Sequence, residues 1–205
     1  MPVAPQRPCP QRVHSDLLQR PTLEQAEQLE TIEREIIVIP DQKIELDDRR
    51  LKARIAMAAA MKKLTTAQEE QKALKTELAE AEKAKDEPLA EQLKAKLADK
   101  DQEVTKRQQA QDYVAAHRKT LAVEQKMLDA KLAVKVAAQM LQEAKIGAAY
   151  QATDEGKLVE GHEPINVSVY EAHLKASKTA LIQANKDFEA QLNKFEALPE
   201  PANAP

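Results

Sequence analysis

The segment EKAKDEPLAEQLKAKL, residues 82–97, consists of strong helix formers apart from Pro88. A proline in a helix interior removes a hydrogen bond and clashes with the preceding turn, at a cost of about 3 kcal/mol. In the first turn of a helix it costs little, because the N–H that it lacks has no partner there. The preceding acids Asp86 and Glu87 suit a cap position and the positive end of the helix dipole. We therefore predict a hairpin turn formed by Asp86, Glu87 and Pro88.

The alternative to a hairpin is one kinked helix through residues 42–146. The charges on either side of Pro88 favour the hairpin. Residues 65–88 contain four bases and seven acids, and residues 89–120 contain seven bases and five acids. Folding at residues 86–88 places segments of opposite net charge side by side, which helps to select a register although each exposed pair contributes only tenths of a kcal/mol.

The composition is typical of long helices and coiled coils. Of the 205 residues, 32% are charged, 42% are hydrophobic and 2% are aromatic. The formal net charge of −3 and the scarcity of aromatic residues disfavour nucleic-acid binding. The single cysteine, Cys9, excludes an internal disulfide and a cysteine-based zinc cluster.

Prolines and glycines divide the chain into five parts. We predict a disordered tail over 1–21, an acidic first helix plus the hairpin over 22–146, a loop or linker over 147–167, a C-terminal helix over 168–198 that packs on the hairpin base, and a disordered tail over 199–205. Within 22–146 the helices are expected at about 23–36, 42–85 and 88–146. The segment IIVIP at 36–40 is either a last helical turn or a short extended link, and its β-branched residues favour the link.

Apolar residues at alternating spacings of three and four predict the surfaces on which these helices pack. The two arms of the hairpin share a thin seam, and its predicted interaction residues are Leu64, Leu74, Leu78, Leu93, Leu97, Val104 and Val114. Away from the tip the helices carry a second apolar strip and need further partners. The predicted bundle core consists of Leu51, Ile55, Leu121, Leu128, Leu132, Val134, Leu141, Leu174, Leu181 and Phe188. The expected fold is all-α: a long antiparallel coiled-coil hairpin with a three- or four-helix bundle at its base and flexible, proline-rich termini.

No catalytic or cofactor-binding motif is present. The glycines have no phosphate-cradling spacing, and the sequence contains no nucleophile elbow. The residues His162, Glu163 and His173 could hold a metal ion, but no supporting motif accompanies them, so we expect exposed histidines. We therefore expect no enzymatic activity, cofactor, metal or small-molecule substrate.

The membrane is possible as a partner but not favoured. The segment RRLKARIAMAAAMKKL, residues 49–64, has bases at both ends and an apolar middle, as a membrane-surface helix can have. Its bases are spread around the helix, which favours a core helix. The apolar runs are too short to span a bilayer and the start lacks the apolar region of a signal peptide, so we expect a cytoplasmic protein.

Two segments, DEPLAEQLKAKLADKDQEV at 86–104 and LDAKLAVKVAAQML at 128–141, resemble the hairpin of the phage-shock protein A branch of the ESCRT-III-like membrane remodellers. This resemblance implies a membrane-surface protein that polymerises through its hairpin. Two features depart from the family: residues 23–36 are strongly acidic where the family has an amphipathic membrane helix, and the tip carries a proline. We do not assign the chain to this family.

The thin seam motivates the functional hypothesis. An isolated two-helix stalk with Ala, Gln, Lys and Arg at seam positions is marginally stable. We therefore expect a non-enzymatic scaffold or adaptor that acts by self-assembly or by docking a protein partner along the hairpin. The alternative is a membrane-surface remodelling protein.

Overall fold

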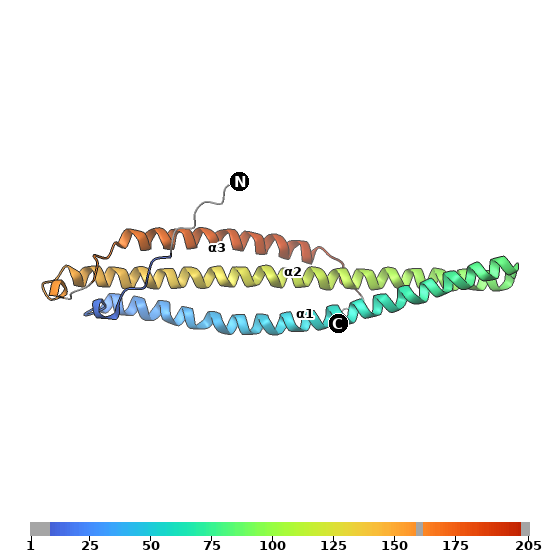
Figure 1. Cartoon of the computed structure of the whole chain (residues 1–205), viewed down its shortest axis with the longest axis horizontal. Coiled ribbons are helices and arrows are strands. Elements are labelled where there is room, and N and C mark those ends of the chain that lie inside the picture. Colours follow the sequence, from blue (N-terminus) through green and yellow to red (C-terminus); the bar gives the residue numbers. More distant parts are fainter. Residues whose placement is uncertain (1–8, 159–161, 202–205) are drawn as a thin grey trace. The chain divides into compact units, whose positions relative to one another are not determined.

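The computed structural model describes residues 9–158 and 162–201. It contains three long helices, α1 (Leu23–Ala84), α2 (Glu87–Gln151) and α3 (Val167–Glu196), and two single 3-10 turns at Ser15–Leu17 and Gly156–Leu158. No strand occurs in these two ranges. The prediction of an all-α fold built on an antiparallel helical hairpin is confirmed, and Figure 1 shows the tight turn that joins α1 to α2.

The chain forms two compact units. Unit 1 comprises Met1–Glu45 and Glu124–Phe188, and unit 2 comprises Leu46–Val123 and Glu189–Pro205. Both units contain an antiparallel pair of segments from α1 and α2, and both contain part of α3.

In unit 1 the antiparallel register is fixed by bonds between α1 and α2. Lys135 Nζ lies 2.6 Å from Glu35, Lys43 Nζ lies 2.7 Å from Asp129, and Gln142 Nε2 donates to Gln28 at 2.8 Å. The numbers of the paired residues add up to 170 or 172 in each case. Beneath these pairs lies the core of the unit, which includes Ile39, Leu128, Ala137, Met140, Ala144 and Ile146.

The predicted interruption at residues 36–40 is wrong, because α1 continues through Pro40 as one helix. Ile32, Ile36 and Ile39 keep the alternating spacing of four and three, and Ile39 is only 1% exposed. Pro40 lies on the exposed side of the helix. Packing of the isoleucines on α2 therefore compensates for the hydrogen bond that Pro40 cannot donate.

The N-terminal segment also differs from the prediction of a disordered tail over 1–21. Leu17 is 3% exposed, and Arg12 donates a 2.8 Å hydrogen bond to Gln139 of α2. At Gly147 an added Cβ would come within 2.6 Å of Ile165 and 3.0 Å of Val13. Gly147 therefore lies inside α2 and permits close packing, and the predicted helix end at residue 146 is wrong. The predictions of disorder at residues 1–8 and 202–205 concern residues outside the described ranges.

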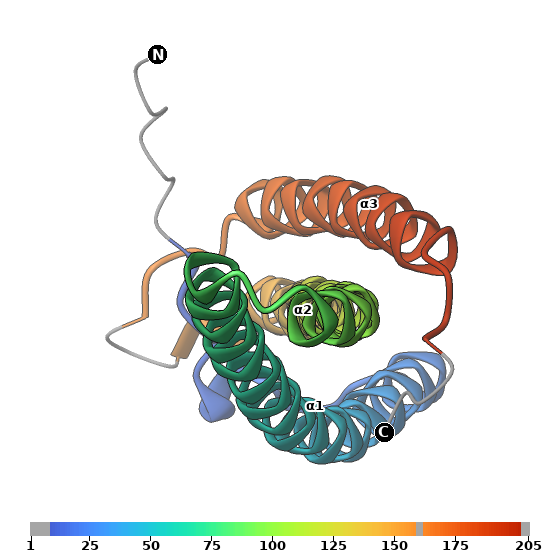
Figure 2. The same ribbon diagram turned by 90° about the vertical axis from the view of Figure 1, so that its right-hand side faces the viewer.

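The third helix lies alongside α2 in Figure 1 and Figure 2, and its bounds agree within two residues with the prediction. The predicted core residues Leu174, Leu181 and Phe188 are half-buried. The same holds for four further residues of this helix: Tyr170, Ser177, Ala184 and Phe195. In unit 2 the Phe195 ring lies 4.9 Å from that of Tyr113 and 5.2 Å from that of His117. The helix α3 packs through one half-buried strip of residues, and none of its residues is fully buried.

The two prolines of the hairpin make a matched test of this fold. Replacing Pro40 by alanine restores an N–H to a helix interior, so we expect the free energy of unfolding to rise by about 1–3 kcal/mol. Pro88→Ala, in the first turn of α2, should change it by less than about 0.5 kcal/mol. Chemical denaturation of both variants measures the two values. Equal effects of the two substitutions would contradict a continuous α1.

Candidate functional site: the faces of the helical hairpin

The hairpin turn begins with a Schellman cap at the end of α1. Lys85 has a left-handed φ of 58° and its N–H donates to the carbonyl of Glu82 at 3.2 Å. The N–H of Asp86 donates to the carbonyl of Ala81 at 3.0 Å. These two bonds satisfy the last carbonyl groups of the helix and reverse the chain.

The predicted turn residues then start α2. The Asp86 carboxylate accepts a hydrogen bond from the N–H of Leu89 at 3.2 Å, which makes Asp86 the N-cap. Glu87 and Pro88 occupy the first turn, where a missing N–H costs nothing. The turn is therefore built by capping chemistry at both helix ends.

The predicted interaction seam lies inside the hairpin. Leu64, Leu93 and Val114 are 4–6% exposed. Leu74 and Leu78 pack against a cluster of Ala81, Ala90 and Leu93, while Leu97 and Val104 are half-buried. Pairing of α1 with α2 within one chain therefore buries these side chains fully or in part.

Polar residues at seam positions form hydrogen bonds and ion pairs between α1 and α2. Lys100 Nζ lies 2.6 Å from Glu70 and 2.7 Å from Glu103, and Gln71 donates to Asp101 at 2.6 Å. The hydrogen bonds to Glu103 and Glu70 raise the pKa of Lys100 above the usual lysine value. The hydrogen bond from Lys100 lowers the pKa of Glu103. The thin seam is therefore reinforced by matched charges near its middle.

The predicted core residues on α2 and α3 are buried or half-buried, whereas those predicted on α1 are exposed. Leu121 and Leu128 are buried, and the half-buried members are Leu132, Val134, Leu141, Leu174, Leu181 and Phe188. Leu51 and Ile55, by contrast, are 55% and 63% exposed. The buried residues Leu46 and Ala53 lie on the side of α1 that packs against α2. Leu51 and Ile55 lie on the opposite side, which no described segment covers.

Two exposed apolar patches result on α1, one in each unit. We define the acidic patch as Ile37, Val38 and Ile44 of unit 1, which lie within residues 24–45, a segment with seven acids and two bases. We define the basic patch as Leu51, Ile55 and Met61 of unit 2, which lie within residues 49–68, a segment with six bases and no acid. Each of the six side chains is at least half exposed. In the sequence, both patches could be anticipated from the large aliphatic residues of α1 that lie outside the seam.

A buried polar cluster in unit 1 was not anticipated from the sequence. Gln139 accepts from Arg12 and donates to Glu33 at 3.3 Å, which ties the N-terminal segment to both helices. The adjacent Glu143 is 7% exposed, and its Oε2 has no hydrogen-bond partner in the described part of the chain. Burial raises the pKa of Glu143, and the nearby charge of Glu33 adds to this effect while Arg12 opposes it.

The side chain of Tyr170 borders the same cluster from α3. Its hydroxyl donates to the backbone carbonyl of Gln11 at 2.8 Å. Burial and the charge of Glu143 raise the pKa of Tyr170.

The two histidines that the sequence grouped as possible metal ligands have different neighbours in the structure. His162 faces His14 at a ring distance of 4.9 Å, whereas His173 Nε2 lies 3.6 Å from Cys9 Sγ. His14, Asp16 and His162 place ligand atoms within 4.8 Å of one another. His14 also caps the turn at Ser15–Leu17, because its Nδ1 accepts a hydrogen bond from the backbone N–H of Asp16. His14 and Asp16 therefore have a structural role in this turn.

Comparison of the chain with protein-family models, with curated proteins and with solved structures finds no match. Among the described helices, none combines the length and the apolar character that a membrane crossing requires.

The buried carboxyl of Glu143 predicts a pH-dependent effect on stability. Because its pKa is raised in the folded protein, its contribution to stability is present below the unfolded pKa and is lost as pH rises through the folded pKa. The neutral variant Glu143→Gln should therefore be more stable than the wild type at pH 7, by about 1 kcal/mol, with a difference that shrinks toward pH 4. Thermal unfolding at several pH values tests this. Glu171→Gln, at an exposed position of α3, is the control, and an equally pH-dependent effect there would count against the assignment.

Proposed function

We propose that this protein is a non-enzymatic coiled-coil scaffold that acts by assembling with further copies of itself. The observation that supports this most directly is the exposed aliphatic surface of α1. Its seam residues are satisfied by α2, yet Ile37 and Ile44 remain 67% and 68% exposed. Large aliphatic side chains clustered on a helix face are typical of a surface that a partner covers.

Charge complementarity supports a second copy as that partner. The acidic patch lies in a segment with five more acids than bases, and the basic patch lies in a segment with six bases and no acid. A contact between the acidic patch of one copy and the basic patch of another pairs opposite charges around an apolar centre. Opposite potentials guide association, while the apolar centre contributes most of the binding free energy.

Each copy carries one patch of each kind, so the same contact can repeat from copy to copy. A contact between two different surfaces closes into a ring when its rotation allows and otherwise extends into a filament. Either outcome suits a scaffold.

A membrane-surface role is the second candidate, because the basic patch combines exposed Leu51, Ile55 and Met61 with cationic neighbours. Such a surface can attract anionic lipids. The acidic patch opposes this role, since it is repelled by the same lipids. Co-sedimentation with anionic vesicles separates the candidates: binding that Leu51→Ser weakens would support the membrane role.

The scaffold proposal predicts that removing the acidic patch dissociates the assembly. We expect the wild type to be oligomeric at micromolar concentration and the variant Ile37→Ser with Ile44→Ser to have at least tenfold weaker association, about 1.4 kcal/mol. Light scattering coupled to size-exclusion chromatography measures the molar mass. Assembly of the wild type should also weaken as the salt concentration rises, because salt screens the opposed patches.

The control is Ile182→Ser on α3, which removes an isoleucine of comparable exposure, 57%, from outside both patches. Its assembly should match that of the wild type. A wild type that is monomeric at all accessible concentrations, or equal effects of the two substitutions, would contradict the proposal.

A further inference from the structure

The middle of the unit 2 hairpin is strongly basic. Residues 49–68 of α1 carry six bases and no acid, and residues 104–123 of α2 carry four bases and one acid. The pairs Lys100–Glu70 and Gln71–Asp101 set the antiparallel register, and this register places the two segments opposite each other. The charge is therefore concentrated in one place in a chain whose net charge is −3.

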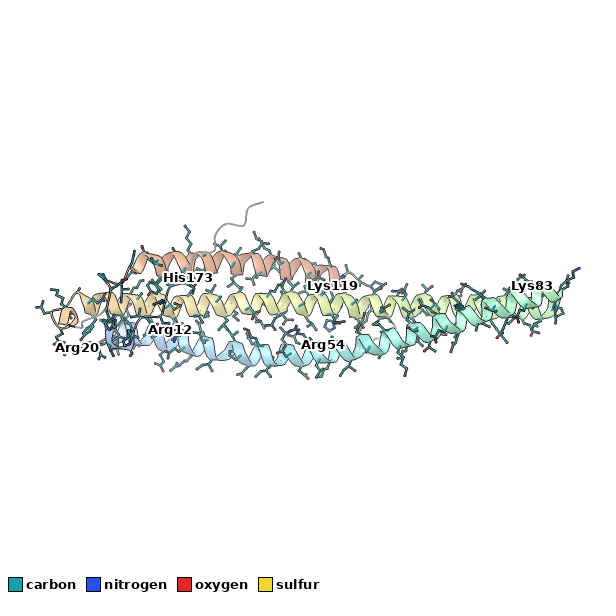
Figure 3. All side chains as sticks on the ribbon, in the orientation of Figure 1. Arg12, Arg20, Arg54, Lys83, Lys119 and His173 are labelled. Atoms are coloured by element: carbon teal, nitrogen blue, oxygen red, sulfur yellow. The ribbon has the colours of Figure 1, made fainter. Side chains whose placement is uncertain are left out.

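A cavity of about 350 Å³ lies within this basic region. Four cationic side chains line it, Arg50 and Arg54 from α1 and Arg118 and Lys119 from α2. The remaining lining is apolar: Ala115, Leu121 and Ala122. Among the described residues, no acidic side chain contributes to the lining. Figure 3 places Arg54 on α1 and Lys119 on α2 at nearby levels along the hairpin.

These cations are incompletely neutralised by the protein. Arg50 pairs with Asp47 at 3.0 Å, one turn away on the same helix. Arg54, Arg118 and Lys119 form no ion pair within residues 9–158 and 162–201. Arg54 and Arg118 are both exposed and line the same cavity from opposite helices, so like charges lie together there.

Gathering these like charges at one cavity lowers the stability of the folded chain modestly, because exposed charges repel each other only weakly in water. The same hairpin matches Lys100 with Glu70 and Glu103 a few turns closer to the tip. A local conflict of this kind, at a cavity, is typical of a binding site, since a ligand of opposite charge relieves it.

We propose that this cavity binds an anion that carries two or more adjacent phosphate groups. Each guanidinium group, of Arg50, Arg54 and Arg118, can donate two hydrogen bonds to phosphate oxygens, and Lys119 adds a further positive charge. The small side chains of Ala115 and Ala122 leave room for the ligand. Several cations around one compact cavity fit a small, multiply charged anion better than a single phosphate. The ligand is either a free polyphosphate or the phosphorylated headgroup of a lipid.

This inference does not rest on the proposed self-assembly. Two of the four cations, Arg118 and Lys119, belong to α2, whereas both patches belong to α1. Substitutions on α2 therefore test the cavity while they leave the patches unchanged.

Titration with tripolyphosphate, followed by calorimetry, tests the site directly. We expect one binding site per chain in the wild type. The variant Arg118→Gln with Lys119→Gln should bind at least tenfold more weakly. The matched control is Lys72→Gln with Lys75→Gln, which removes the same charge from exposed positions of the same hairpin and should bind as the wild type does.

A second readout separates ligand binding from a structural role. Without the anion, the Arg118→Gln and Lys119→Gln variant should melt at a slightly higher temperature than the wild type, because repulsion among the cations that line the cavity is relieved. Addition of tripolyphosphate should raise the melting temperature of the wild type and the control but not of this variant. A lower melting temperature of the anion-free variant would contradict the charge conflict on which the proposal depends.

Vesicles of phosphatidylcholine with phosphatidylinositol bisphosphate distinguish the two sources of the ligand. Binding of tripolyphosphate alone identifies a free anion, and vesicle binding that tripolyphosphate displaces identifies a lipid headgroup. Both results support the site. Equal binding by the cavity variant and the control, or tight binding to duplex DNA that tripolyphosphate does not displace, would overturn it.

Discussion

Antiparallel pairing of α1 with α2 determines which side chains are buried and which remain exposed. In both units the residue numbers of cross-helix partners such as Lys135–Glu35 and Lys100–Glu70 add up to 170. Aromatic residues are scarce, so the seam draws on Ala, Leu and Ile together with matched polar pairs. Each of these contacts stabilises the pair only modestly, and the hairpin depends on their number and on a turn that is capped at both helix ends.

The same pairing explains the exposed surfaces. A helix offers one side to its partner, and α1 carries more aliphatic side chains than that side can accommodate. The third helix lies alongside α2, so the excess on α1 stays uncovered as two patches in segments of opposite charge. Bringing the two basic segments of unit 2 together also creates the cationic cavity. The proposed assembly and the proposed anion site therefore have one structural origin, the register of the hairpin. They share Arg50 and Arg54, whereas Arg118 and Lys119 belong to the anion site alone.

The sequence was informative where the controlling interactions are local. Proline and cap chemistry at residues 86–88 placed the turn, and heptad spacing placed the seam. Prediction failed where tertiary packing overrides a local rule: Pro40 should end a helix, but burial of Ile39 on α2 keeps α1 continuous. Periodicity revealed that Leu51 and Ile55 lie off the seam, yet it could not show whether another helix covers them. The cationic cavity was equally inaccessible, because it joins residues that only the antiparallel register brings together.

The most direct test of the hairpin register is a distance between spin labels on its two arms. Lys62 and Gln109 are exposed and lie opposite each other in this register, so Lys62→Cys and Gln109→Cys in a Cys9→Ser background provide the sites. Packed helices lie about 8–10 Å apart, and with label linkers we predict a narrow distribution at about 10–20 Å. One uninterrupted helix would separate the same residues by about 70 Å, at 1.5 Å per residue. A distribution near that longer distance would contradict the hairpin, and with it both proposals.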